Sequence, residues 1–281
     1  MNFREALTSL AWRSGFNRAA RALFARRGSF VLGLHGVADK RLPEKPRSAQ
    51  PSLCRTELEQ LLRWTREHFR FLTPDEYFNG ESGVLLTFDD GFRNHHENAL
   101  PILRKYDAPA IFFVPTQHVR NPTDWLPATR RSAEALGPVP ETVASDLFDG
   151  MSVEALRDCA GEPLLTIGSH TVSHPFMTQL DDETLRRELV DSKNFLETII
   201  DQSVDTFAYP TGDYDERVAR AVAAAGYRAA FVEESRGFGL GSYELSRIGI
   251  YDVRAAYLST KLNGLYRRPT KGVLCADEQH R

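Results

Sequence analysis

The sequence contains two adjacent aspartates at the end of an apolar stretch, in Thr87-Phe-Asp-Asp-Gly91. Consecutive residues of a regular strand point to opposite faces, so Asp89 and Asp90 can serve one site only if the chain turns there, which Gly91 permits. One carboxylate could then hold a metal ion while the other moves a proton. The alternative is that these residues form only a turn and the cap of the following helix.

A pair of histidines, His170 and His174, follows another apolar stretch at 164–167. Four residues is the spacing of about one helical turn, which would let both imidazoles reach the same metal ion. Histidines at this spacing also occur by chance. Together with an aspartate, however, they supply two His and one Asp, the ligand set of a catalytic metal centre that keeps positions open for water and substrate.

Two further stretches could complete a hydrolytic site: His35, which follows the apolar stretch 30–34, and the turn Pro210-Thr211-Gly212, which follows 206–209. A backbone N–H exposed in such a turn can stabilise an oxyanion. A lone histidine is more often structural, but beside a metal centre that lacks a proton donor His35 would suit the role of general acid.

Short apolar strands alternate with longer helical stretches from residue 28 onward. The expected strands are 30–34, 83–88, 110–114, 164–167, 206–209, 227–232 and 245–250, and the expected helices are 55–70, 94–106, 152–159, 181–200, 215–225 and 255–265. This alternation predicts a mostly parallel α/β sheet, open or closed into a barrel. Working groups in such folds lie at the carboxyl ends of the strands, where all four candidate stretches fall.

The chain shows no linker between independent halves, so we expect one domain at 29–281 preceded by a helical segment at 1–28. Residues 1–27 hold six arginines and one glutamate with apolar residues at helical spacing. This basic amphipathic segment could pack on the domain or on a second subunit, or lie on an anionic membrane surface. The proline-rich segment 115–150 is expected to be a long loop that leans over the site.

The composition excludes several classes of protein. The 281 residues carry 35 Lys and Arg against 38 Asp and Glu, which argues against nucleic-acid binding. The longest apolar run is five residues, whereas a spanning helix needs about 20, and charged residues interrupt every apolar stretch near the N-terminus. We therefore expect no transmembrane segment, no signal peptide and a cytoplasmic protein. Cys54, Cys159 and Cys275 are expected to be reduced thiols.

The three motifs Thr87-Phe-Asp-Asp-Gly91, Ser169-His-Thr-Val-Ser-His-Pro175 and Phe207-Ala-Tyr-Pro-Thr-Gly212, in this order, resemble those of the polysaccharide deacetylases, the NodB-homology domain of carbohydrate esterase family four. The resemblance runs from about residue 30 to about residue 250. It implies a distorted (β/α) barrel with about seven strands and one divalent metal ion, usually Zn²⁺, with Co²⁺ or Ni²⁺ as alternatives. By position, it makes Asp90, His170 and His174 the metal ligands and Asp89 the catalytic base.

The sequence departs from the family pattern in its third motif. The family commonly has an arginine two residues before the Phe and an aromatic residue between the Pro and the Gly, where this chain has Asp205 and Thr211. Arg247 is our candidate for the arginine that braces the base, with a surface salt bridge as the alternative. The backbone N–H of Thr211 could still serve the oxyanion, because that role does not use the side chain.

The late Leu-x-His motif that supplies the general acid in most relatives is also missing. Some circularly permuted relatives carry that histidine on the first strand, and Leu32-Gly-Leu-His-Gly36 resembles this arrangement, so His35 is our candidate acid. We expect the other histidines of the helical stretches to be solvated: His68, His95, His96 and His118. Trp125 and Tyr209 could contact a sugar ring, although aromatic residues are more often part of a core.

The sequence thus predicts a metal-dependent hydrolase that removes an N-acetyl or related N-acyl group from an amino sugar. Without a signal peptide, a cytosolic or lipid-linked precursor is the expected N-acetylated saccharide substrate. Two alternatives stay open: a deformylase or amidase that acts on a small non-sugar amide, and a sugar-binding module that keeps the fold without turnover. The sequence does not specify the saccharide, the metal ion or the oligomeric state.

Overall fold

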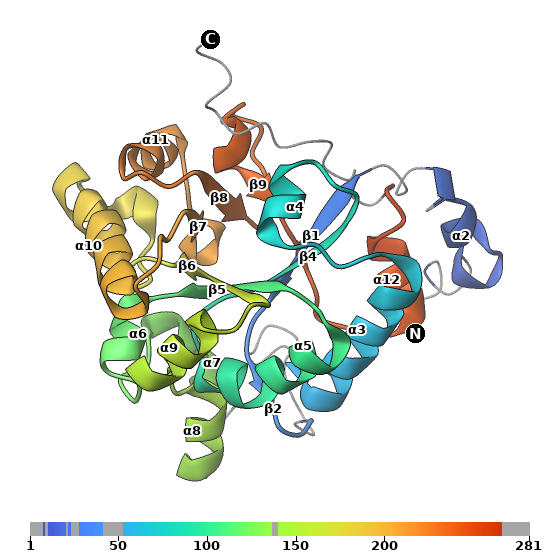
Figure 1. The fold of residues 1–281 in the computed structure, drawn as a ribbon, viewed down its shortest axis with the longest axis horizontal. Coiled ribbons are helices and arrows are strands. Elements are labelled where there is room, and N and C mark those ends of the chain that lie inside the picture. The colour runs from blue at the N-terminus through green and yellow to red at the C-terminus, as the bar shows by residue number, and fades with distance from the viewer. Residues whose placement is uncertain are drawn as a thin grey trace.

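A single parallel sheet forms the centre of the molecule (Figure 1). The computed structural model describes residues 8, 11–20, 22–23, 28–41, 53–136 and 140–265. The order of the strands in the sheet is β10-β1-β4-β5-β6-β7-β8-β9. These strands are β1 Ser29–Leu34, β4 Gly83–Phe88, β5 Ala110–Val114, β6 Leu165–Ser169, β7 Thr206–Ala208, β8 Ala229–Val232, β9 Leu245–Ser246 and β10 Ile248–Gly249. All the expected strands are present, with shifts of one or two residues at their ends.

The two edges of this sheet are joined by one short stretch of chain. Leu245 in β9 pairs with β8, and Ile248 in β10 pairs with β1 at the opposite edge, with Arg247 between the two strands. The sheet therefore closes on itself as a distorted (β/α) barrel. When β9 and β10 are counted as one strand, the barrel has the seven strands that the sequence predicts.

Alternate strand residues face two separate hydrophobic cores. All residues of β1, β4 and β5 are buried, as expected for parallel strands that are covered on both faces. Leu86 and Phe112 belong to the larger core, beneath the outer helices, whereas Leu85 and Phe113 belong to a smaller one with Tyr77. The short helix α4 (Pro74–Phe78), which we did not expect, supplies Tyr77 and Phe78 to this inner core.

The outer helices surround the sheet close to where the sequence predicts them (Figure 1). They are α3 Arg55–His68, α5 Leu100–Tyr106, α9 Val153–Ala160, α10 Asp182–Ile200, α11 Glu216–Ala224 and α12 Ala255–Lys261. Helices α10 and α11 begin where Asp181 and Asp215 accept hydrogen bonds from backbone N–H groups of the first turn. A π-helical segment, η2 (His95–Ala99), precedes α5.

The segment 115–150, expected to be a long loop, contains three helices instead. They are α6 Thr116–Arg120, α7 Pro127–Leu136 and α8 Glu141–Phe148. The prolines that suggested a loop lie at the helix starts: Pro115 and Pro140 precede α6 and α8, and Pro127 begins α7. Proline is tolerated there because the first N–H groups of a helix have no partner within the helix.

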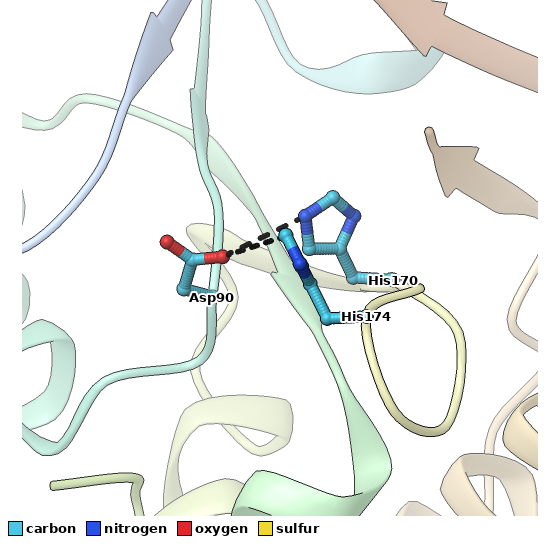
Figure 2. Close-up of side chains that lie close together, drawn as sticks. All are labelled: Asp90, His170 and His174. Carbon is cyan, nitrogen blue, oxygen red and sulfur yellow. Dashed lines mark ion pairs between the residues drawn. The ribbon is translucent and has the colours of Figure 1, made fainter. Parts of the chain in front are cut away.

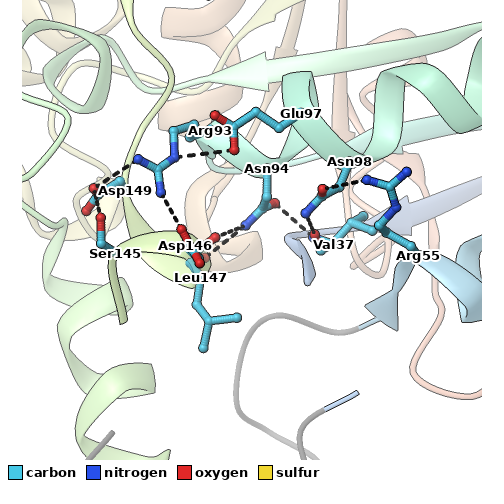
Figure 3. Close-up of polar contacts among 10 residues, drawn as sticks. All are labelled: Val37, Arg55, Arg93, Asn94, Glu97, Asn98, Ser145, Asp146, Leu147 and Asp149. Carbon is cyan, nitrogen blue, oxygen red and sulfur yellow. Dashed lines mark hydrogen bonds and ion pairs between the residues drawn. The ribbon is translucent and has the colours of Figure 1, made fainter. Parts of the chain in front are cut away.

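Hydrogen bonds connect the end of α8 to the residues that follow Asp89 and Asp90 (Figure 3). The Asn94 side chain donates to the carbonyl oxygens of Asp146 (3.2 Å) and Leu147 (3.0 Å) and accepts from the Val37 N–H (2.8 Å). Arg93 forms a 2.9 Å ion pair with Asp146. These contacts hold the carboxyl end of α8 beside the carboxyl ends of β1 and β4.

The N-terminal segment is described in part, and its helix α2 (Phe16–Ala20) lies against α12. Asn17 is buried there and hydrogen-bonds to Thr260 and Asn263, each at 3.0 Å. No helix within the described ranges is long and apolar enough to span a membrane. Cys54 and Cys159 are buried free thiols, and Cys275 lies outside the described residues.

Candidate metal centre

Asp90, His170 and His174 meet at the carboxyl ends of β4 and β6 (Figure 2). All three are buried, and one ligand atom from each lies within 4.8 Å of the other two. Oδ1 of Asp90 is 3.7 Å from Nε2 of His170 and 3.3 Å from Nε2 of His174. The structure therefore brings together the three residues that the sequence nominates as metal ligands.

The two histidines project from a loop, so the expected helical turn is absent. Thr171 and His174 have left-handed backbone conformations, with φ of 70° and 58°. The Glu188 carboxylate, on α10, holds this loop by accepting from the N–H groups of Val172 (2.8 Å) and Ser173 (3.0 Å) and from the Ser173 hydroxyl (2.7 Å). Because the loop is fixed from outside, the histidines converge without a helix.

The orientation of His170 suits a metal ligand. Its Nδ1 lies 2.7 Å from the carbonyl oxygen of Ala208, so a proton on Nδ1 leaves the lone pair of Nε2 facing Asp90. Burial lowers the pKa of His170 to about 4, which makes the imidazole neutral at pH 7. A neutral imidazole is the form that binds a metal ion.

Asp90 is held as a carboxylate at this centre. Burial alone would raise its pKa, but the hydrogen bond and charge of His174, with the charges of His35 and His170, hold the pKa well below its usual value. Two imidazole nitrogens and one carboxylate oxygen are the donors of open catalytic sites for Zn²⁺ and related divalent ions. The buried donor set therefore fits the divalent metal ion that the sequence predicts.

The neighbouring aspartate forms a buried ion pair with Arg247. The guanidinium contacts both carboxylate oxygens of Asp89, with Nη1 2.6 Å from Oδ1 and Nη2 2.7 Å from Oδ2. Arg247 is 3% exposed, which excludes the surface salt bridge that the sequence left open. Burial alone would raise the pKa of Asp89, but the charges of Arg247 and of the nearby histidines His170 and His35 hold it below its usual value.

The two remaining candidates follow β1 and β7, two strands that are not neighbours in the sheet. His35 directly follows β1, its Nδ1 is buried, and its charge contributes to the low pKa values of Asp89 and Asp90. Thr211 follows β7 in an exposed turn and has a left-handed backbone with φ of 55°. The end of β1 thus brings a histidine close to both aspartates, and the end of β7, beside β6, presents a backbone turn.

Two histidines that we expected to be solvated are completely buried, so that expectation was wrong. His95 packs among Phe88, Phe92 and Phe112, and burial lowers its pKa to about 3. His118 contacts the carbonyl oxygens of Asp90 and Phe148. His118 lies in the segment that follows β5, so its position after a strand end was a signal that could have identified it as a functional candidate.

The aromatic residues considered for sugar contact have structural partners. Trp125 donates to Asp149 at 2.8 Å and packs against Phe148, and Tyr209 is 1% exposed. Both therefore match the alternative of a core role. The exposed aromatic side chains close to the candidate site are Phe176, two residues after His174, and Tyr251, which packs against Gly249.

Comparison with known proteins gives one family and several distant relatives. A family model described as polysaccharide deacetylase matches residues 78–230. YxkH of Bacillus subtilis (strain 168) is 23% identical over 205 residues, or 69% of this chain, and the match spans just under two thirds of YxkH (64%). The poly-beta-1,6-N-acetyl-D-glucosamine N-deacetylase of Staphylococcus aureus (strain MSSA476) is 23% identical over 235 residues, which cover 77% of this chain and 74% of that enzyme.

Solved structures share the fold. The Streptococcus pyogenes deacetylase PplD, in complex with acetate, superposes with a TM-score of 0.65 at 22% identity and covers 84% of this chain and 98% of PplD. IcaB from Ammonifex degensii superposes with a TM-score of 0.63 at 22% identity and covers 84% of this chain and 97% of IcaB. At these identities the likeness establishes the distorted barrel and no finer property.

Proposed function

This chain belongs to the polysaccharide deacetylase family, and from that membership we propose that it is a metal-dependent hydrolase that removes an N-acetyl, or related N-acyl, group from an amino sugar. The observation that carries the proposal is the convergence of Asp90, His170 and His174 beside a second aspartate, Asp89, that is paired with a buried arginine. A metal-binding triad and an ionised base next to it are the groups that metal-assisted amide hydrolysis uses.

Each residue of the site has a distinct part in this proposal. Asp90, His170 and His174 would hold a divalent ion, with Zn²⁺ first and Co²⁺ or Ni²⁺ as alternatives, and the ion would polarise the acyl oxygen and lower the pKa of a bound water. Asp89 would accept the proton of the attacking water, and its low pKa keeps it ionised for this role.

Two residues act on the reacting groups of the substrate. The Thr211 backbone N–H donates to the oxyanion, and His35 protonates the departing amine. His35 directly follows β1, the neighbour of β4, and its charge influences both aspartates, which supports this role. In this proposal His35, after the first strand, takes the role of the histidine in the late Leu-x-His motif, which this sequence lacks.

We place the saccharide along the rim that carries Phe176 and Tyr251. Phe176 is 45% and Tyr251 is 47% exposed, and each follows a residue of the candidate site by two to four positions in the chain. Exposed aromatic rings offer flat apolar faces to a sugar ring while leaving its hydroxyls free to hydrogen-bond. The poly-N-acetylglucosamine activity in the name of the Staphylococcus aureus relative makes β-linked N-acetylglucosamine oligomers the first substrates to test.

The N-terminal segment supports a further proposal, contact with an anionic membrane. The polar Asn17 of α2 faces α12, whereas Trp12, Phe16 and Leu23 are exposed, as are Arg13 and Arg18. Exposed apolar side chains among arginines suit the interface of an anionic bilayer. Binding to phosphatidylglycerol vesicles but not to phosphatidylcholine vesicles, lost in Trp12→Ser/Phe16→Ser, would support this contact. Equal sedimentation of wild type and variant would contradict it.

The metal content of the purified protein tests the central proposal. Elemental analysis should find close to one divalent ion per chain in the wild type and a large loss of that ion in His170→Ala and Asp90→Ala. Asp89→Asn should keep the metal but stop the release of acetate from N-acetylglucosamine oligomers. Metal-loaded wild type that releases no acetate from any N-acyl sugar would favour a sugar-binding module instead. A protein that binds no Zn²⁺, Co²⁺ or Ni²⁺ after reconstitution would contradict the mechanism.

A further inference from the structure

The buried imidazole of His118 touches the backbone of a proposed metal ligand. Its Nδ1 lies 2.8 Å from the carbonyl oxygen of Asp90, and its Nε2 lies 3.1 Å from the carbonyl oxygen of Phe148. The ring packs edge-on against Phe92 with a 5.5 Å separation of centroids. His118 is 0% exposed, so water does not compete for these two carbonyl groups.

The backbone that His118 contacts is in a conformation that needs support. Asp90 has a φ of 77°, in the left-handed region that residues with a side chain rarely adopt. Such conformations persist where the surrounding structure holds them, and they are frequent at functional sites. The bond from His118 therefore acts on the residue whose backbone conformation directs a carboxylate toward the two histidines.

The short helix that carries His118 is attached to the other half of the metal centre as well. At the start of α6, the N–H of Thr116 donates to the carbonyl oxygen of Thr171 (3.1 Å), and the N–H of Gln117 donates to that of Val172 (2.9 Å). Both acceptors lie in the loop between His170 and His174. Helix α6 thus connects the loop that carries the two histidines with the residue that carries the carboxylate.

Gly150 packs directly against His118. A Cβ atom on Gly150 would lie 2.0 Å from the carbonyl oxygen of His118 and 2.7 Å from Cδ2 of its ring, so only glycine fits. The Gly150 N–H donates to Pro122, and Met151 donates to the carbonyl oxygen of Gly91. The ring is therefore confined between the end of α8 and the turn that follows the two aspartates.

We propose that His118 is a positioning residue: its Nδ1–H holds the carbonyl group of Asp90 and thereby sets the carboxylate in register with His170 and His174. This inference rests on the metal centre of the proposed function. A neutral imidazole has one N–H and faces two carbonyl groups, so the proposal commits to the tautomer with the proton on Nδ1. The bond to Asp90 raises metal affinity, whereas the contact with Phe148 serves packing.

Two substitutions separate the two contacts. The amide nitrogen of asparagine lies two bonds from Cβ, as Nδ1 of histidine does, and that of glutamine lies three bonds away, as Nε2 does. His118→Asn can therefore keep the bond to Asp90, whereas His118→Gln loses that bond and can donate only to the carbonyl oxygen of Phe148. Zn²⁺ affinity is measured by titrating the apoprotein against a chromophoric chelator, with thermal unfolding of each apoprotein as the control for folding.

We expect His118→Asn to bind Zn²⁺ nearly as tightly as wild type and His118→Gln to bind it about tenfold or more weakly, as is typical when a residue that orients a metal ligand is lost. Equal affinities in both variants, or the reverse order, would overturn the inference. These outcomes leave the proposed function intact because wild type binds the ion in each case. A wild type that binds no Zn²⁺ would overturn both.

A measurement on the unaltered protein covers the case in which either variant fails to fold. Long-range ¹H–¹⁵N spectra distinguish a protonated from an unprotonated ring nitrogen, and His118 in the wild type should carry its proton on Nδ1. An unprotonated Nδ1 would have no hydrogen to donate to Asp90, and that result would overturn the inference without any substitution.

Discussion

The guanidinium of Arg247 donates to both carboxylate oxygens of Asp89 at the point where the barrel closes, although the two residues are 158 positions apart in the sequence. Arg247 is the single residue between β9, which pairs with β8, and β10, which pairs with β1. Its Nη1 also lies 3.2 Å from the Thr87 hydroxyl, which donates to Leu32 in the neighbouring strand. The residue at which the barrel closes therefore also contacts the proposed base.

Replacing Arg247 with methionine should shift the pH dependence of hydrolysis. Burial raises the pKa of Asp89 once the opposing guanidinium charge is removed, so the base becomes protonated at a higher pH. The acid limb of kcat/KM should move toward neutral pH. Leaving a buried carboxylate without its partner should also cost about 3–5 kcal/mol of stability.

Arg247→Lys is the matched control for this prediction, because it keeps the charge but lacks the planar pair of N–H donors that guanidinium offers to the two oxygens. It should show a smaller shift of the acid limb than Arg247→Met. If the acid limbs of both variants coincide with that of wild type, Arg247 does not set the pKa of the base.

Glu188→Gln should weaken metal binding although Glu188 is no ligand. Its carboxylate accepts three hydrogen bonds from the loop between the two histidines, and a glutamine amide would turn an N–H toward at least one of those donors. We expect about a tenfold loss of Zn²⁺ affinity. Asp191→Asn, on the exposed part of the same helix, should have no effect. Equal affinities in the two variants would show that the loop is rigid without Glu188.

His95 should make the protein sensitive to acid. Burial lowers its pKa from 6.5 to about 3, so between these values the unfolded chain binds a proton that the folded chain does not. This contribution is fully present above pH 6.5 and is lost at up to about 1.4 kcal/mol per pH unit as the pH falls toward 3.

The substitution His95→Phe should flatten that slope, because three phenylalanines already surround the ring. Denaturant unfolding between pH 5 and 7 measures it, and His96→Gln at the half-buried neighbouring position serves as control. A variant as acid-sensitive as wild type would place the sensitivity on other buried groups.

The strands were predictable because each is a short apolar run, and Asp89, Asp90, His170 and His35 were found because they directly follow such runs. The helices of 115–150 were missed because Pro115, Pro127 and Pro140 were interpreted as loop residues. The loop that holds His170 and His174 depends on the hydrogen bonds that it donates to the distant Glu188, which spacing cannot reveal. Contacts between residues far apart in sequence set these details, and periodicity reports only on neighbours.

Tyr251 is expected to contribute to substrate binding. Its pKa is raised by partial burial and by the negative charges of Glu233 and Asp89. Tyr251→Ala should raise KM for N-acetylglucosamine oligomers about fivefold, since an aromatic contact contributes about 1 kcal/mol. Tyr251→Phe keeps the ring and should retain most of the affinity. An unchanged KM in Tyr251→Ala would place the saccharide elsewhere.

A substitution at Thr211 can distinguish whether its backbone N–H or its side chain acts in hydrolysis. If its N–H serves the oxyanion, Thr211→Ala keeps the donor and should leave kcat within about twofold of wild type, whereas losing an oxyanion donor costs about 10²–10³. Alanine tolerates the φ of 55° about as well as threonine does, so the turn should persist. A loss of kcat of about 10² or more in a Thr211→Ala variant with normal metal content would assign the oxyanion role to the hydroxyl group instead of the backbone. Hydrolysis would then depend on a side chain at the position where the family pattern has an aromatic residue.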